Sequence, residues 1–139
     1  RIIHLVRDPL DTCYAIYKTL FFNAYEFSYD LEELADYYIE YRKTMRHWHD
    51  AMPGVILDVN YEDLVTDTEA QARRIYDWCG LEWTPDALRT PDRTRVFATA
   101  SAAQVREPVH TRSIHSSRRH LEGLAPLAKR LSEAGLFDA

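Results

Sequence analysis

Several residue types that define specialised classes of protein are scarce in this chain of 139 residues. It has 2 cysteines, 4 glycines and 6 prolines, and no internal repeat. These counts exclude a disulfide-stabilised scaffold, a collagen-like or low-complexity chain and a repeat protein. No apolar run approaches the roughly 18 residues of a membrane helix, so we expect no membrane segment. The chain also lacks an Asn-x-Ser/Thr acceptor, and we expect a reducing, cytoplasmic location.

Acidic and basic residues are unevenly distributed along the chain. Its composition, with 46% hydrophobic and 28% charged residues, is that of a globular protein. Residues 22–69 include 12 acids and 3 bases, whereas residues 89–130 include 9 bases and 3 acids. The net charge of −5 disfavours general binding to nucleic acid. The basic C-terminal third predicts an anion-binding site.

Short apolar runs alternate with helical patterns, which is typical of an α/β fold. Residues 2–6 predict a buried strand and residues 55–59 a second one, and the helical crossover between them predicts a parallel pair. Capping aspartates and the glycine and proline positions predict helices over 9 to about 21 or 22, 31 to about 52, 68–79 and about 117–134. The predicted caps are Asp8, Asp30 and Asp67, with Gly80 as a C-terminal stop.

The first predicted strand also bears on domain organisation. A buried parallel strand needs neighbours on both sides, and this one begins at the first residues of the chain. We therefore expect residues 1–139 to be the C-terminal part of a single domain, truncated at its N-terminus and mainly helical with a small parallel sheet.

Arg7 is the first candidate for a ligand-binding residue. It follows a predicted parallel strand and precedes a helix, which is where open α/β sheets bind ligands. A helix start offers unpaired N–H groups, and the arginine side chain offers a planar fork of donors suited to phosphate. The alternative is that Arg7 pairs with Asp8 or Asp11 on the surface.

Three segments together resemble the PAPS-dependent sulfotransferases. They are residues 3–12 (IHLVRDPLDT), 60–65 (NYEDLV) and 101–109 (SAAQVREPV), followed by a similar tail over 120–127. The resemblance is greatest to a bacterial branch that often follows TPR repeats and is related to tyrosylprotein sulfotransferases. It implies a P-loop-like α/β fold and transfer of a sulfuryl group from PAPS to an acceptor hydroxyl or amine, with PAP as the product.

The resemblance also implies roles for individual residues. Arg7 would bind the 3′-phosphate of the cofactor, and Tyr61 would pack near the nucleotide. Ser101 would lie by the bridging phosphate or sulfuryl group, where a hydroxyl stabilises developing charge. The loop that closes over the nucleotide would be formed by Gln104, Val105 and Arg106. Without the resemblance, Tyr61 is equally a packing residue at a strand end and Ser101 a helix cap.

Three features differ from the pattern of the family. The loop that holds the 5′-phosphosulfate and the catalytic base are expected upstream of Arg1, so the chain alone is not expected to carry out the reaction. Ala15 replaces a serine that contacts the 3′-phosphate, and loss of this hydrogen bond should weaken binding by about 1.5–3 kcal/mol. Ser116-Ser117 replaces an Arg-Trp pair or a lysine. Three nearby arginines either replace that charge or form a solvated basic face: Arg112, Arg118 and Arg119.

Two other functions remain open from the sequence. One is a non-catalytic, degenerate sulfotransferase-like binding module, suggested by Ala15 and Ser116-Ser117. The other is a small P-loop kinase fragment that uses Arg7 to bind ATP. A requirement for the 3′-phosphate of the nucleotide would distinguish a sulfotransferase from a kinase.

Other features suggest no metal and leave the acceptor and partners open. His47 and His49 lie about 200° apart on a helix and cannot share one ion, and the remaining histidines have no cysteine partner, so we expect no metal. Cys13 and Cys79 are expected to be small buried side chains. The aromatic residues 21–29 either line the acceptor side or belong to the core. The acceptor is not identified, and an uncovered strand edge would favour homo-oligomers.

Overall fold

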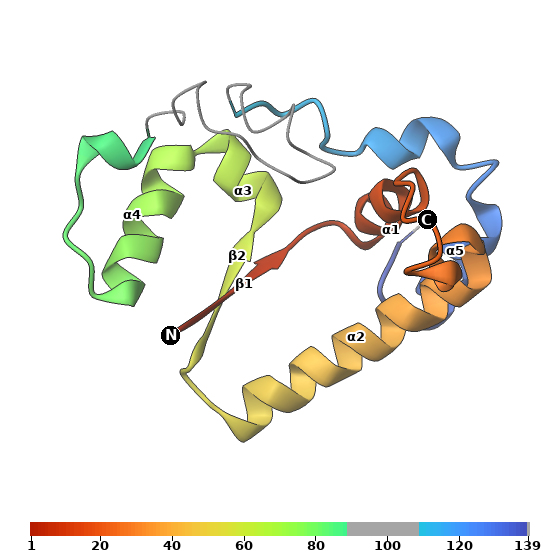
Figure 1. Cartoon of the computed structure of the whole chain (residues 1–139), viewed down its shortest axis with the longest axis horizontal. Helices are drawn as coiled ribbons and strands as arrows, with labels where there is room; N and C mark the ends of the chain where they lie inside the picture. The colour runs from red at the N-terminus through yellow and green to blue at the C-terminus, as the bar shows by residue number, and fades with distance from the viewer. Residues whose placement is uncertain (89–108, 139) are drawn as a thin grey trace. The chain divides into compact units, whose positions relative to one another are not determined.

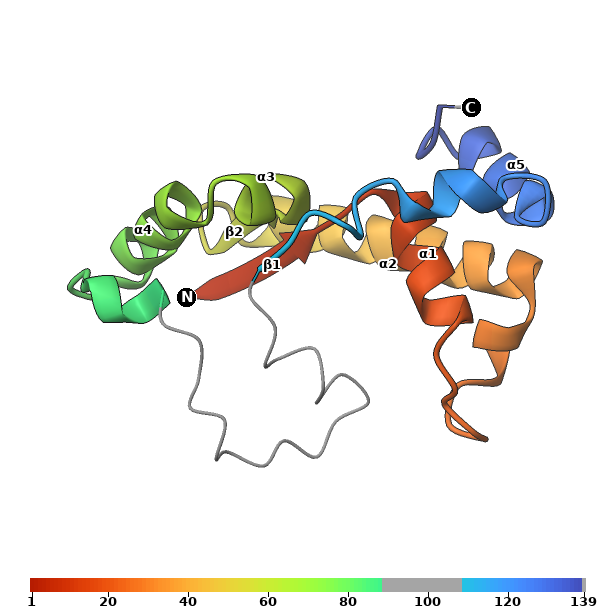
Figure 2. The same cartoon turned by 90° about the horizontal axis from the view of Figure 1, so that it is seen from above.

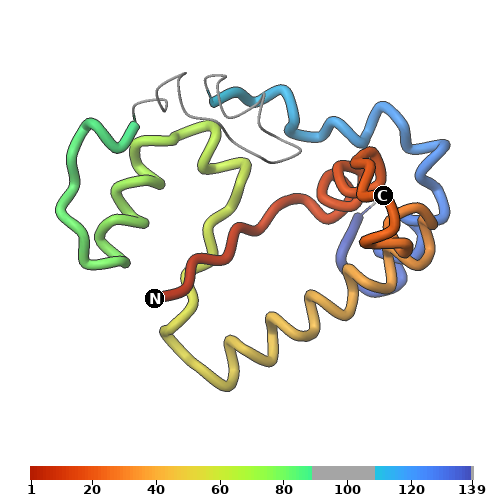
Figure 3. Tube along the Cα trace, in the orientation of Figure 1, coloured from red at the N-terminus to blue at the C-terminus, as the bar shows by residue number. Residues whose placement is uncertain are grey.

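A computed structural model describes residues 1–88 and 109–138 of the chain. The chain divides into two compact units. We call Arg1–Val6 with Ile56–Arg112 the sheet unit, and Arg7–Val55 with Ser113–Ala139 the helical unit. Figure 3 traces the chain as it leaves the sheet unit after Val6, returns to it at Ile56 and enters the helical unit again at Ser113. The expectation of a single domain over residues 1–139 stays a prediction.

The sheet unit contains a two-stranded parallel sheet formed by β1 (Ile2–Val6) and β2 (Ile56–Asn60) (Figure 1). The register places Ile2 opposite Ile56 and Val6 opposite Asn60. The segment between the strands is helical, as a parallel connection requires. The predicted parallel pair is therefore confirmed, with β2 shifted by one residue from its predicted range.

The expected burial of β1 is wrong for the part of the chain that the structure describes. Ile2, Ile3 and Leu5 are 43%, 45% and 51% exposed. By contrast, the apolar residues of β2 are buried: Ile56, Leu57 and Val59. The physical reason is that the two helices following β2 pack against β2, whereas among the described elements β1 makes its main contacts with β2 itself.

Two helices follow β2 in the sheet unit. The Asn60 side chain accepts a hydrogen bond of 3.1 Å from the Asp63 amide and so begins α3 (Tyr61–Thr66), a helix that the sequence pattern did not predict. α4 (Thr68–Cys79) begins at Asp67, which accepts a bond from the Ala70 amide, and it ends at Gly80 with a φ of 69°. Only glycine adopts this left-handed geometry without steric cost. The cap at Asp67 and the turn at Gly80 confirm both predicted ends of α4. A 3-10 turn, η2 (Pro85–Leu88), ends the first described range of this unit.

The helical unit is built around α1 (Pro9–Tyr17), α2 (Leu31–Ala51) and α5 (Ala125–Glu133) (Figure 2). Asp30 begins α2 as predicted, because its side chain accepts the Glu32 and Glu33 amides. Two 3-10 helices, η1 (Glu26–Tyr29) and η4 (Ser116–His120), complete the unit. Its core consists of Leu10, Cys13, Leu34, Ala35, Tyr38, Leu124, Leu127 and Leu131.

Two predicted helices are shorter than their sequence patterns. α1 ends at Tyr17 rather than at residue 21 or 22, because the Thr19 amide bonds to the Ile16 carbonyl and the chain turns at Phe22, where φ is 54°. The predicted helix over 117–134 is divided into η4 and α5. The division falls beside Gly123 and Pro126, and a proline fits the first helical turn but not a helix interior.

Candidate functional site

The predicted strand–Arg–helix arrangement is present at the start of the helical unit. Arg7 follows β1 directly and precedes α1. The Asp8 side chain accepts a 2.8 Å hydrogen bond from the Asp11 amide, and Pro9 occupies the first helical turn without an N–H of its own. The sequence led us to expect that this helix start would offer unpaired amides to an anion. Because Asp8 caps the Asp11 amide and Pro9 has no N–H group, this helix start offers fewer unpaired amides than we expected.

The Arg7 guanidinium makes close contacts within the helical unit. Its Nη2 donates a 2.6 Å hydrogen bond to the Ser113 carbonyl oxygen. The same atom lies 3.6 Å from Oδ2 of Asp11, a residue with no exposed surface. The ion pair with Asp11 that the sequence offered as an alternative is therefore formed, but with a buried carboxylate rather than on the surface. The Arg7 side chain itself remains 19% exposed.

The Asp11 carboxylate also binds the chain around Ser116 and Ser117. Its Oδ1 accepts a 2.8 Å hydrogen bond from the Ser117 amide and lies 3.5 Å from the Ser116 hydroxyl. Burial raises the pKa of Asp11, but the hydrogen bonds from Ser117 and the positive charge of Arg7 outweigh it and hold the pKa below its ordinary value. The Ser116-Ser117 pair, identified in the sequence as a departure from the family, therefore anchors the C-terminal segment to α1.

The lowered pKa of Asp11 predicts a contribution to stability that depends on pH. Ionised Asp11 stabilises the fold above its unfolded pKa, near 3.8, and this contribution is lost as the pH falls through the lower folded pKa. We expect the difference in unfolding free energy between wild type and Asp11→Asn to shrink below about pH 4. Urea unfolding across a pH series measures it. The exposed Asp138→Asn serves as the control, and a difference independent of pH would refute the assignment.

The other residues predicted to contribute to the cofactor site belong to several different parts of the chain. Tyr61 is the first residue of α3 and is half-buried in the sheet unit, whereas Arg7 belongs to the helical unit. Ala15 lies in α1. Arg118 and Arg119 are exposed on η4. The remaining predicted site residues lie outside the described ranges: Ser101, Gln104, Val105 and Arg106.

The aromatic stretch over residues 21–29 has both exposed and packed members. Phe27 packs against the core and stacks on Tyr37, with ring centroids 4.0 Å apart. Phe22, Tyr25 and Tyr29 are exposed, and the Tyr29 hydroxyl accepts a 2.7 Å hydrogen bond from the Phe21 amide. Of the two alternatives drawn from the sequence, the core applies to Phe27, and a role near the acceptor stays a prediction for the exposed rings.

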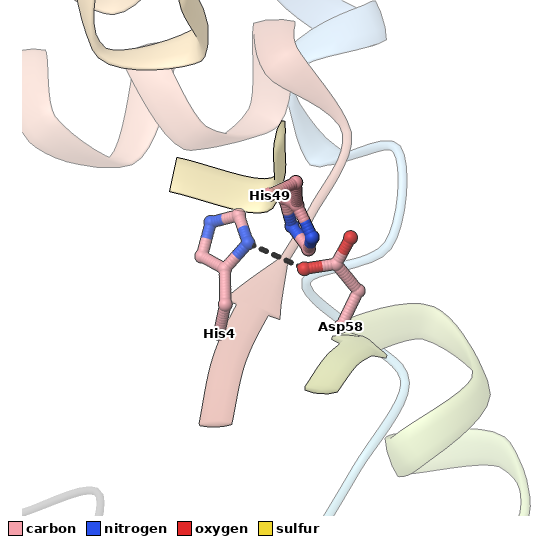
Figure 4. Close-up of side chains that lie close together, drawn as sticks. All are labelled: His4, His49 and Asp58. Atoms are coloured by element: carbon pink, nitrogen blue, oxygen red, sulfur yellow. Dashed lines mark hydrogen bonds and ion pairs between the residues drawn. The ribbon is translucent and has the colours of Figure 1, made fainter. Parts of the chain in front are cut away.

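A polar pair in the sheet was missed from the sequence. His4 and Asp58 stand directly opposite each other in the parallel register, and His4 Nδ1 lies 2.7 Å from Asp58 Oδ1 (Figure 4). Both are polar residues within strands that are otherwise mainly apolar, and aligning the two strands by these positions would have indicated the pair. It ties β1 to β2 in one register, because a shift of one residue would separate the two side chains.

Cys13 and Cys79 provide a test of burial in this structure. Burial, assisted by the nearby negative charge of Asp8, raises the pKa of Cys13 to about 12, whereas Cys79 is half-buried. Alkylation requires the thiolate, so at about pH 8 iodoacetamide should modify Cys79 and leave Cys13 intact until the protein unfolds. Mass spectrometry of native and urea-treated samples measures this, with Cys79→Ser as the control. Equal modification of both residues in the native protein would contradict the packing of α1.

The comparison with protein families agrees with the resemblance found in the sequence. The profile of the Sulfotransferase family matches residues 1–85, a range that contains both β strands, Arg7 and Tyr61. The match covers more than half of the chain, and the chain belongs to the sulfotransferase family. The narrower assignment to the TPR-associated branch stays a prediction.

The similarity to one relative extends over almost the whole chain. An uncharacterized protein of Aquifex aeolicus (strain VF5) is 30% identical over 136 residues, which is 96% of this chain. The chain spans 18% of the length of that relative. No solved structure matches the chain. Within residues 1–88 and 109–138, no helix combines the length and apolar character needed to cross a membrane.

Proposed function

We propose that this chain forms the 3′-phosphate side of the cofactor site of a PAPS-dependent sulfotransferase. The reaction would transfer a sulfuryl group from PAPS to an acceptor hydroxyl or amine and release PAP. The observation that carries the proposal is the placement of Arg7 within the segment matched by the family, at the end of β1 and before α1. An arginine at this position of an α/β fold suits a doubly charged phosphate.

The chain contributes mainly binding and positioning to this reaction. Arg7 attracts the 3′-phosphate and fixes the nucleotide, since sulfuryl transfer, like phosphoryl transfer, depends on alignment of donor and acceptor. Tyr61 packs beside the nucleotide. Ser101 donates a hydrogen bond to the negative charge that develops on the bridging oxygen, and Gln104, Val105 and Arg106 cover the nucleotide. The base that removes the acceptor proton belongs to a segment outside this chain.

A non-catalytic binding module is the second candidate. Two observations favour it: Ala15 in α1 supplies no hydroxyl to a phosphate, and Arg7 already faces the buried carboxylate of Asp11. Such a module would bind PAP weakly and transfer no sulfuryl group. A sulfotransferase would transfer sulfuryl groups from PAPS, and the binding module would not. The kinase considered from the sequence would require ATP instead of PAPS.

A transfer assay with the full-length protein tests the proposal. The protein is incubated with radiolabelled PAPS and a cell extract as the source of acceptors, and label transfer and PAP release are measured together. Relative to the extract alone, we expect added label on an acceptor and an equal amount of released PAP, and no added transfer from radiolabelled ATP. PAPS binding is measured in a parallel calorimetric titration of the same protein. Binding without transfer would support the non-catalytic module, and absence of both binding and transfer would contradict both candidates.

A further inference from the structure

The residue that faces Arg7 has no role in the function proposed above. Asp11 is fully buried, one turn into α1 from Arg7, and its Oδ2 lies 3.6 Å from Arg7 Nη2. A buried carboxylate is costly to desolvate unless it is paired and hydrogen-bonded, so its presence here needs a reason. The local connections of Asp11 supply one.

Asp11 is joined to Arg7 by two routes. The first is the direct ion pair through Oδ2. The second passes through the C-terminal segment: Asp11 Oδ1 accepts the Ser117 amide at 2.8 Å, and the Ser113 carbonyl, four residues earlier, accepts Arg7 Nη2 at 2.6 Å. All of these residues belong to the helical unit. The Asp11 carboxylate therefore contacts the Arg7 guanidinium directly and also holds the segment whose Ser113 carbonyl accepts a hydrogen bond from it.

The backbone of this segment is bent around the carboxylate. His115 has a φ of 54° and a ψ of 27°, the left-handed conformation, which a residue with a side chain adopts at a steric cost. The turn at His115 directs the Ser117 amide toward Asp11 Oδ1. The cost is offset by the hydrogen bonds that the carboxylate accepts, so the conformation of residues 113–117 depends on Asp11.

We propose that Asp11 is a positioning residue, which orients Arg7 for the 3′-phosphate both directly and by holding the Ser113–Ser117 segment against the start of α1. Asp11 does not touch the nucleotide and acts only through Arg7. This inference rests on the proposed function of Arg7. It also gives Ser116 and Ser117 a purpose in the same site, because both supply hydrogen-bond donors to Oδ1 of the carboxylate.

The variant Asp11→Asn separates positioning from simple charge competition. Asparagine keeps an oxygen for the Ser117 amide but removes the charge that faces Arg7. If Asp11 only competed with phosphate for Arg7, the variant would bind PAP more tightly. If Asp11 positions Arg7, the variant binds PAP about 10-fold more weakly, which is the effect expected when a residue that orients a binding side chain is lost. Binding of 5′-AMP by the variant is then unchanged. We expect the second result, measured by calorimetry on the full-length protein.

Two further variants make the test specific. Leu131→Ala destabilises the same core without touching Arg7 or Asp11, so it should leave the ratio of PAP to 5′-AMP affinity unchanged. In the Arg7→Ala background, Asp11→Asn should have no further effect on this ratio, because its route to the phosphate is already lost. An unchanged or increased ratio in Asp11→Asn alone would overturn the positioning role. An unchanged ratio in Arg7→Ala alone would instead overturn the role proposed for Arg7.

Discussion

Replacing Arg7 with alanine should remove the ability of the full-length protein to distinguish PAP from 5′-AMP. A hydrogen-bonded contact to a charged group contributes about 1.5–3 kcal/mol, so PAP affinity should fall by about 10- to 150-fold. Affinity for 5′-AMP, which has no 3′-phosphate, should change little. Calorimetric titration of both nucleotides on the same preparation measures the ratio.

The Arg7 variant needs controls because its partner is buried. Arg7→Ala leaves Asp11 as a buried carboxylate without the positive charge it faces, and this lowers stability as well. Arg7→Lys keeps a positive charge near Asp11 but loses the planar fork, and it should retain part of the discrimination. Lys129→Ala, at a side chain 77% exposed on α5, should change neither stability nor binding. A ratio that survives in Arg7→Ala would remove Arg7 from the site.

Replacing Leu127 with alanine should produce a large loss of stability. Leu127 has no exposed surface and belongs to the core that joins α1, α2 and α5. Leucine-to-alanine changes in such cores lower the unfolding free energy by about 2–5 kcal/mol, because a cavity remains. Urea unfolding followed by circular dichroism measures the change. Leu121→Ala, at a side chain 42% exposed, is the matched control and should have a much smaller effect, and an equal loss in both variants would contradict the core described here.

The features that the sequence predicted well are set by neighbouring residues. Asp30 and Asp67 lie within three residues of the amides they cap, and Gly80 supplies a left-handed turn that depends on its own backbone alone. The parallel pairing followed from the length and helical character of the segment between the strands. Such features need no knowledge of distant segments, so single-residue patterns were sufficient.

The errors arose where distant or competing contacts decide the structure. The contact between Asp11 and Ser117 joins positions 106 residues apart, and no local pattern indicates it. The burial of β1 depends on which other elements pack against it, which its apolar sequence does not specify. α3 was missed because Asn60 ends a strand and caps a helix at once, and the first of these roles concealed the second.

The candidate site was predicted in part. The position of Arg7 between a strand and a helix followed from residues 2–9, and the choice between phosphate and Asp11 as its partner could not be made from spacing alone. The structure forms the ion pair with Asp11, and the guanidinium retains an exposed portion. An arginine held by an internal carboxylate is less free to rotate, which reduces the entropic cost of binding an anion. The two interpretations of Arg7 are therefore compatible.

The most direct test of the proposed function is the affinity of the full-length wild-type protein for PAP compared with 5′-AMP, measured by calorimetry. The two nucleotides differ only in the 3′-phosphate assigned to Arg7. We predict that PAP binds at least about 10-fold more tightly, the lower bound expected for one contact to a charged group. Equal affinities in a protein shown to be folded would contradict the assignment of this chain to the 3′-phosphate side of a PAPS site.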